Sequence, residues 1–333
     1  MAYKNTSWTL LILIFLLPIF FIPGGGLPLE ATKSALVVLA VVLAALFFLF
    51  EILNGKNLNF PRSHLLLTAL LLPAVYLLSA ILSTPSSLSL FGYNIDVGTF
   101  GHILLGVILL LLVSMVIKET SQALHVFTAL FISLAILALF VLLKIIVGGN
   151  FLSLGNFFGN VGNPLGNWTD LGVVFGFLAV FSSLIIGMLS MNLWAKTLLY
   201  ASFVVSTALL VVMNFSVAFA ITLGISVMVY LYFLRVEKKK AILPIILGAI
   251  SLAFLVGPSI LPETVAKISN VSNTDVRPTL GATLSISKAV LSQTALLGSG
   301  PNTFGQDWLV YKPINVNTTP FWAVAFPFGL GFL

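Results

Sequence analysis

The sequence predicts an all-α fold: a polytopic transmembrane helical bundle with a large external loop that contains a short amphipathic helix. Three observations support this fold class. The chain has 59% hydrophobic and only 7% charged residues, and its mean hydropathy is +1.16, whereas soluble domains carry about 25% charged residues. Nine apolar runs approach the roughly 20 residues that cross a bilayer. The lysines and arginines between these runs are distributed as membrane topology requires.

Residues 1–257 are predicted to form a bundle of about nine helices. Pro18 and Pro23 near the end of the first run do not resemble a signal-peptide cleavage site, so we expect this run to remain as a signal-anchor helix. The seventh and eighth helices meet at residues 214–216, in a hairpin that has almost no loop. The nine helices are expected near residues 8–23, 31–51, 64–83, 101–117, 122–147, 168–190, 194–213, 217–234 and 241–257.

The basic residues predict the orientation of these helices, because cytoplasmic loops are enriched in lysine and arginine. With a cytoplasmic N-terminus, the short outer connections contain only Lys33 and Lys144, and the outer loop 84–100 contains no basic residue. The inner connections contain Lys4, Lys56, Arg62, Lys118, Lys196, Arg235, Lys238, Lys239 and Lys240. The net charge of +6 is therefore interpreted as a topology signal, and no nucleic-acid partner is expected.

The ninth helix delivers residues 258–319 to the outer, periplasmic side as a loop that holds the densest external charge. From Pro320 the chain becomes apolar again and reaches Leu333. This length is about half to two-thirds of a span. Residues 320–333 are therefore predicted to be the start of a truncated tenth helix.

The external loop contains a predicted amphipathic helix that lies on the membrane surface. Pro278 suits the first turn of a helix, and a tight turn, Gly298-Ser299-Gly300-Pro301, ends it. One broad side of the helix is apolar and consists of Leu280, Leu284, Ile286, Val290 and Leu291. Arg277 precedes the helix and is the one arginine on the outer side. Its planar guanidinium matches phosphate oxygens, or alternatively it pairs with Asp275 or lipid headgroups.

Few other residues suggest chemistry. The outer loop 148–167 is rich in Gly-Asn steps, and Asn160, Asn163 and Asn167 offer amides that suit sugar hydroxyls, unless the loop is an ordinary connector. The chain has no cysteine, no Walker loop, no H-E-x-x-H and no G-x-S-x-G. Ionisable groups are almost absent from the spans, which disfavours an ion-coupled pump.

Four segments resemble the O-antigen ligase and O-antigen polymerase superfamily, and their order and their positions relative to the spans match that family. The segments are LPLEATKSALVVLAVVLAAL at 27–46, LLSAILSTPSSLSLFGY at 77–93, GNVGNPLGNWTDLGVVFG at 159–176, and VRPTLGATLSISKAVLSQTALLGSGPNTFGQDWLVYKP at 276–313. The last is the best match. It is similar to the family's signature of an arginine, a short amphipathic helix and a G-x-G-P-x-x-F turn.

The resemblance implies a C-type glycosyltransferase of the bacterial inner membrane that needs no metal or other cofactor. Such enzymes take a glycan from a polyprenyl-diphosphate carrier at the outer face and pass it to a lipid, saccharide or protein acceptor. Arg277 matches the family's loop arginine and is expected to bind the diphosphate. Lys288, Lys312 and Asn163 are further candidates for substrate binding. Gly298, Gly300 and Pro301 match the turn and are expected to shape the loop.

Two departures from the family pattern concern catalysis. Many relatives carry a Ser-Arg pair at the start of the eighth span, where this chain has Asn214-Phe215-Ser216-Val217. Relatives with a catalytic histidine place it shortly after the equivalent of NVNTTPFW, where this chain has Ala323-Val324-Ala325-Phe326. The base then lies beyond Leu333, or Asp307 serves instead, or the protein is not an active ligase. The alternative functions are a transporter or flippase of lipid-linked saccharides and a non-catalytic membrane scaffold.

Overall fold

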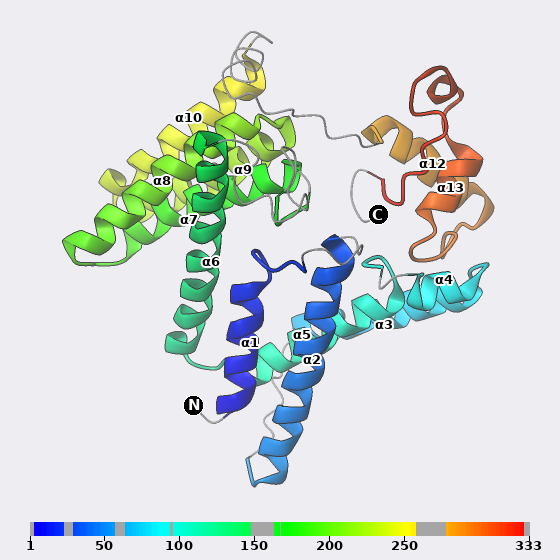
Figure 1. Cartoon of the computed structure of the whole chain (residues 1–333), viewed down its shortest axis with the longest axis horizontal. Coiled ribbons are helices and arrows are strands. Elements are labelled where there is room, and N and C mark those ends of the chain that lie inside the picture. Colours follow the sequence, from blue (N-terminus) through cyan, green and yellow to red (C-terminus); the bar gives the residue numbers. More distant parts are fainter. Residues whose placement is uncertain are drawn as a thin grey trace. The chain divides into compact units, whose positions relative to one another are not determined.

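The computed structural model describes residues 3–22, 29–56, 64–93, 96–147, 163–166, 168–257 and 278–329, and all the regular elements within these ranges are helices (Figure 1). Six of these helices are long and apolar enough to cross a membrane, which agrees with the predicted all-α, multi-pass class. They are α2 (Leu29–Leu53), α6 (Thr120–Val147), α7 (Trp168–Met188), α8 (Leu193–Met213), α9 (Ser216–Val236) and the helical stretch Lys238–Val256, which comprises η1 (Lys238–Ala241) and α10 (Ile242–Val256).

The remaining predicted spans are apolar helices of 13, 19 and 17 residues: α1 (Lys4–Leu16), α3 (His64–Leu82) and α5 (Phe100–Val116). The first helix ends seven residues before the predicted boundary at 23. Pro18 explains this difference, because proline lacks the N–H that would continue the helical ladder. The chain instead closes a turn there, in which the Ile19 and Phe20 N–H groups donate to the Leu16 carbonyl.

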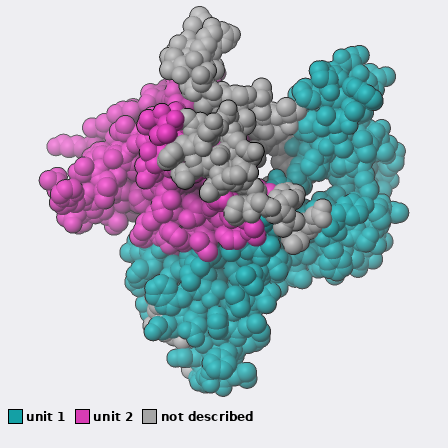
Figure 2. Space-filling view, in the orientation of Figure 1, with its two compact units in different colours: residues 1–13, 30–125, 276–333 teal, residues 14–29, 126–275 magenta. Residues whose placement is uncertain are grey.

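The chain divides into two compact units (Figure 2). Unit 1 contains residues 1–13, 30–125 and 276–333, and unit 2 contains residues 14–29 and 126–275. Besides α1, α2, α3 and α5, unit 1 contains α4 (Ser86–Phe91), α12 (Leu280–Gln293), α13 (Phe304–Tyr311) and the 3₁₀ helix η2 (Ile314–Thr318). Two hydrophobic clusters lie in unit 1. The first joins α1, α2 and α5 through Tyr3, Leu10, Val41, Ala44, Phe48, Leu112, Met115 and Val116.

A buried carboxylate fixes the N-terminal end of α1 to the C-terminal end of α2. Glu51 is 8% exposed. Its Oε1 accepts a hydrogen bond from the Asn5 backbone N–H at 2.9 Å, and its Oε2 accepts one from the Thr6 hydroxyl at 2.8 Å. The first N–H groups of a helix have no partner within the helix and carry partial positive charge. Glu51 therefore acts as a cap that is supplied by another helix.

Replacement of Glu51 by alanine is expected to lower the free energy of unfolding by about 2 kcal/mol, the usual range for hydrogen bonds to a charged group. Thermal melting of the purified protein in detergent measures this change. Glu30→Ala is the matched control, because Glu30 is an exposed carboxylate on the same helix. Equal melting temperatures for the two variants would show that Glu51 does not hold α1.

Unit 2 is organised around α7, which packs against α8, α9 and α10. Leu171, Phe175 and Leu178 of α7 are fully buried in the main hydrophobic cluster. The helices α8 and α9 form the predicted hairpin: α8 ends at Met213, and Asn214 follows in the left-handed conformation at φ 58°. Asparagine tolerates this conformation better than most residues, so two residues suffice to reverse the chain.

Small residues bring α7 and α9 unusually close together. A Cβ on Gly172 would lie 3.1 Å from the Ala218 Cβ, and a Cβ on Gly176 would lie 1.9 Å from the Thr222 Oγ1. Both pairs have a spacing of four residues, so they lie on one face of each helix. This is the small-xxx-small packing of membrane helices, in which close backbone approach supplies van der Waals contact.

The described part of the predicted tenth helix is not helical. Residues 320–329 form turns and irregular structure that fold back on α13. The Val324 carbonyl accepts a hydrogen bond from the Trp308 indole N–H at 3.0 Å, and the Trp322 carbonyl accepts one from Lys312 Nζ. The Phe326 ring also packs edge-on against Trp308. The predicted helix would have kept these two main-chain carbonyls within its own hydrogen bonds, whereas here they bind α13 and Lys312. Residues 330–333 of the predicted helix lie outside the described ranges.

Candidate functional site

The candidate site is built on α12 and α13 in unit 1. Thr279 caps α12, since its hydroxyl accepts a hydrogen bond from the Ala282 N–H at 3.2 Å. Ala282, Ile286 and Val290 recur every four residues and pack against Trp308, which is 2% exposed. The broad apolar side predicted for this helix is in fact two stripes, because Leu280, Leu284 and Leu291 project from another face and are exposed.

The segment between α12 and α13 is a glycine-rich turn that we call the glycine turn (residues 294–303). Gly298, Gly300 and Asn302 all have positive φ, at 65°, 118° and 61°. Gly300 faces the corner between α3 and α4, where an added Cβ would lie 2.4 Å from the Ser83 Cβ and 2.7 Å from the Ser89 Oγ. Only glycine, which has no Cβ, can satisfy both the conformation and this close approach.

Two hydrogen bonds hold the glycine turn on segments that are distant in sequence. The Ser79 hydroxyl of α3 donates to the Leu297 carbonyl at 2.7 Å. The Asn302 side-chain amide donates to Asp96 Oδ2 at 3.0 Å, and the same oxygen accepts the Tyr93 N–H at 3.1 Å. The turn is thus attached both to α3 and to the segment that leads from α4 to α5.

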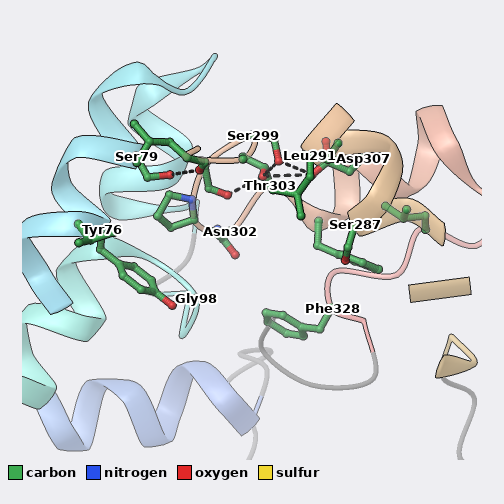
Figure 3. Close-up of a pocket in the computed structure, with 18 of the residues that line it drawn as sticks. Tyr76, Ser79, Gly98, Ser287, Leu291, Ser299, Asn302, Thr303, Asp307 and Phe328 are labelled. Carbon is green, nitrogen blue, oxygen red and sulfur yellow. Dashed lines mark hydrogen bonds between the residues drawn. The ribbon is translucent and has the colours of Figure 1, made fainter. Parts of the chain in front are cut away.

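A cavity of about 390 Å³ lies between α3, the glycine turn, α12 and the start of α13 (Figure 3). Figure 3 shows Tyr76 and Ser79 on the α3 side and Leu291, Ser287 and Asp307 on the side of α12 and α13. Part of its wall is apolar and consists of Val75, Ile286, Val290, Leu291, Leu296, Pro327 and Phe328. Its polar groups belong to Tyr76, Ser79, Ser287, Ser299, Asn302, Thr303 and Asp307.

Asp307 lines this cavity from the first turn of α13, and two hydroxyls of the glycine turn contact it. The Ser299 hydroxyl donates to Asp307 Oδ2 at 2.5 Å, and Thr303 Oγ1 lies 3.3 Å from the same oxygen. A carboxylate in the first turn also interacts favourably with the helix dipole. These contacts orient the side chain, and Oδ1 accepts no hydrogen bond from the described residues.

Of the other predicted site residues, the three of the glycine turn line this cavity, and the predicted substrate-binding residues either lie apart from it or fall outside the described ranges. Arg277 lies outside the described residues, directly before Pro278. Lys288 is exposed on α12, and the Lys312 Nζ donates to a main-chain carbonyl; neither lines the cavity. Gly298, Gly300 and Pro301 all line it.

Asn163 belongs to unit 2, where it forms a turn ahead of α7. Its Oδ1 accepts hydrogen bonds from the Leu165 and Gly166 N–H groups at 2.9 and 3.1 Å. The Asn163 side chain is 4% exposed, and its Nδ2 has no hydrogen-bond partner among the described residues. The other two predicted amides, Asn160 and Asn167, lie outside the described ranges.

The residues that attach the glycine turn were not predicted from the sequence: Ser79, Ser83, Ser89, Asp96 and Asn302. Serines in an apolar span are ordinary, so Ser79 gave no signal. Asn302 directly follows the predicted Gly-x-Gly-Pro turn, and its potential for positive φ could have marked it as part of that turn.

No family model matches the chain, and no characterised protein or solved structure is detectably similar to it.

Proposed function

We propose that the chain is a membrane glycosyltransferase that transfers a glycan from a polyprenyl-diphosphate carrier to an acceptor at the outer face of the bacterial inner membrane. The observation that carries this proposal is the cavity of about 390 Å³ that holds a carboxylate, Asp307, beside α12. The resemblance of residues 276–313 to the signature of the O-antigen ligase and polymerase superfamily supports it, because residues of this segment between 286 and 307 form a large part of the cavity wall.

The lining of the cavity suits an amphiphilic substrate. Its volume falls within the roughly 300–1,000 Å³ of small-molecule sites. The apolar side chains of Val75, Val290 and Leu291 can contact the hydrocarbon part of a lipid carrier. The hydroxyls of Ser79 and Ser287 and the amide of Asn302 can contact sugar hydroxyls. A soluble sugar would not need the apolar wall.

The proposed reaction is a displacement at the anomeric carbon. The acceptor hydroxyl oxygen forms a bond to this carbon, while the bond between the carbon and the diphosphate oxygen breaks and its electron pair leaves with the diphosphate. Negative charge therefore accumulates on the leaving group, where the guanidinium of Arg277 would stabilise the transition state. The proton of the acceptor hydroxyl would pass to Asp307, whose Oδ1 accepts no hydrogen bond from the described residues.

Replacement of Arg277 by alanine is expected to reduce glycosyl transfer by about 10²–10³-fold, the usual effect of removing one group that stabilises a developing negative charge. The assay uses purified protein in liposomes with a polyprenyl-diphosphate-linked glycan and a glycan acceptor. Arg277→Lys should retain part of the activity, because lysine supplies the charge but not the bidentate geometry. Unchanged turnover of Arg277→Ala would contradict the assignment.

A second arm of this assay tests whether Asp307 acts as the base or only accepts the hydrogen bond that orients the glycine turn. Asp307→Asn keeps an oxygen that can accept the Ser299 hydroxyl, so the melting temperature should stay the same while transfer falls. A transporter or flippase would instead move the lipid-linked saccharide across the bilayer and form no new glycosidic bond. Movement without product from wild-type protein would therefore contradict the enzyme and favour the transporter.

A further inference from the structure

We infer that the turn between α9 and α10 is a binding site for an anionic phospholipid. This turn contains four cations and one carboxylate within residues 235–240, and we call it the basic turn. Glu237 pairs with Lys240 at 2.8 Å. Arg235, Lys238 and Lys239 are exposed, and none of the three forms an ion pair within the described part of the chain. Three cations are thus available to a ligand.

The basic turn must lie at a membrane surface if its two helices cross the bilayer. α9 ends at Val236, η1 begins at Lys238, and α9 packs along α10. A one-residue connection of this kind gives the two helices no room to separate. The cations of the basic turn therefore lie where both spans end, at the depth of the lipid headgroups.

The length of α10 brings the cations close to the lipid phosphates. Ile242–Val256 has 15 residues, which measure about 22 Å at 1.5 Å per residue. This is less than the roughly 30 Å of the hydrocarbon core, and the stretch Lys238–Val256 reaches 19 residues only because it includes the three lysines of η1. A short apolar helix is accommodated by local thinning of the bilayer or by displacement of its flanking residues toward the core. Both responses place η1 at or below the phosphate level.

Apolar side chains next to the basic turn favour a lipid over a free phosphate ion. Tyr232 and Val236 of α9 are 44% and 61% exposed, and Ile242 of α10 is 58% exposed. Tyr232 and Ile242 lie within one helical turn of the cations, toward the interior of their helices, and Val236 lies between Arg235 and Lys238. A phospholipid would place its phosphate against Lys238 and Lys239 and its acyl chains along these apolar groups. Inorganic phosphate could use only the charged part of the site.

Charge is the property that selects the lipid. A zwitterionic headgroup carries a cation that would lie close to the three unpaired cations, whereas phosphatidylglycerol carries net negative charge. Each lysine or arginine near an anionic membrane surface contributes about 1 kcal/mol. Loss of three such cations should therefore weaken the binding of phosphatidylglycerol by at least about tenfold, and the binding of phosphatidylcholine should not change.

The test is native mass spectrometry of the full chain, purified in detergent and given equal amounts of phosphatidylglycerol and phosphatidylcholine. Wild-type protein should retain phosphatidylglycerol preferentially, and the variant Arg235→Gln/Lys238→Gln/Lys239→Gln should retain at least tenfold less. The matched control removes three dispersed cations on the same predicted side, Lys56→Gln/Lys118→Gln/Lys196→Gln, and should behave as wild type. Excess glycerol 3-phosphate should not displace the retained lipid.

The inference is overturned by equal retention of the two lipids on wild-type protein, by an equal loss in the control variant, or by displacement with glycerol 3-phosphate. A second measurement covers the case in which the triple variant does not fold. Phosphatidylglycerol should raise the melting temperature of the wild-type protein more than phosphatidylcholine does, and 1 M salt should remove this difference. Equal melting temperatures in the two lipids would also contradict the inference.

Discussion

Replacement of Gly300 by alanine is expected to detach the glycine turn from α3 and α4 and to abolish the proposed glycosyl transfer. The new Cβ would lie 2.4 Å from the Ser83 Cβ, and the residue has φ +118°. The unfavourable conformation costs about 1–3 kcal/mol, and the steric overlap costs a similar amount. The hydrogen bond from Ser79 to the Leu297 carbonyl would then be lost with the turn.

Gly298 provides the matched control for this prediction. It lies two residues away, also has positive φ, and has no atom within 4 Å of an added Cβ. Gly298→Ala should therefore lower the free energy of unfolding by only about 1 kcal/mol, because only the left-handed conformation is unfavourable there. Circular dichroism melting and the transfer assay measure both variants. Equal losses of melting temperature and of transfer rate in Gly298→Ala and Gly300→Ala would show that the contact with Ser83 is unimportant.

Replacement of Gly176 by valine is expected to separate α7 from α9 and to lower the melting temperature of the protein by roughly 10 °C. The first added carbon alone would lie 1.9 Å from the Thr222 Oγ1 and 3.2 Å from the Thr222 Cβ. Because α7 is the centre of unit 2, the displacement would extend to α8 and α10. Thermal melting in detergent and size-exclusion elution measure the loss.

A compensating substitution tests this packing without relying on a damaged protein. Gly176→Ala clashes chiefly with the Thr222 hydroxyl, which is buried and has no hydrogen-bond partner among the described residues. Thr222→Ala should therefore cost little, and the double variant should recover much of the stability that Gly176→Ala loses. Gly224→Ala on α9 is the control, because nothing lies within 4 Å of its added Cβ. An absence of recovery in the double variant would contradict the proposed contact.

The membrane helices could be predicted from sequence because hydrophobicity and length alone decide which segments can cross a bilayer. All nine predicted segments are helical in the structure, with shifted ends. Composition could not show that residues 320–329 are non-helical, since this depends on the packing of the Phe326 ring against Trp308 of α13 and on the hydrogen bond from the Trp308 indole to the Val324 carbonyl. A sequence window records the apolar character of a segment but not the surface that it covers.

The candidate site was harder to predict, because its geometry depends on pairs of residues that are far apart in the chain. The glycine turn has a local signature, since Gly298 and Gly300 suit positive φ wherever the chain folds. Its attachment to Ser79 and Asp96 has no local sequence signature, because those residues precede the turn by about two hundred positions. Similarly, nothing near Glu51 in the sequence indicates that it caps a helix 45 residues earlier.

The division of unit 1 has a consequence for biosynthesis. The ribosome completes α3, α4 and α5 long before it reaches the glycine turn, and the Ser79–Leu297 hydrogen bond joins residues 218 positions apart. All of residues 126–275 emerge in the interval. Nascent chains that stop before residue 297 can contain every one of the six long helices, yet they lack the partner of Ser79. All six of these helices can therefore be inserted into the membrane while the cavity does not yet exist.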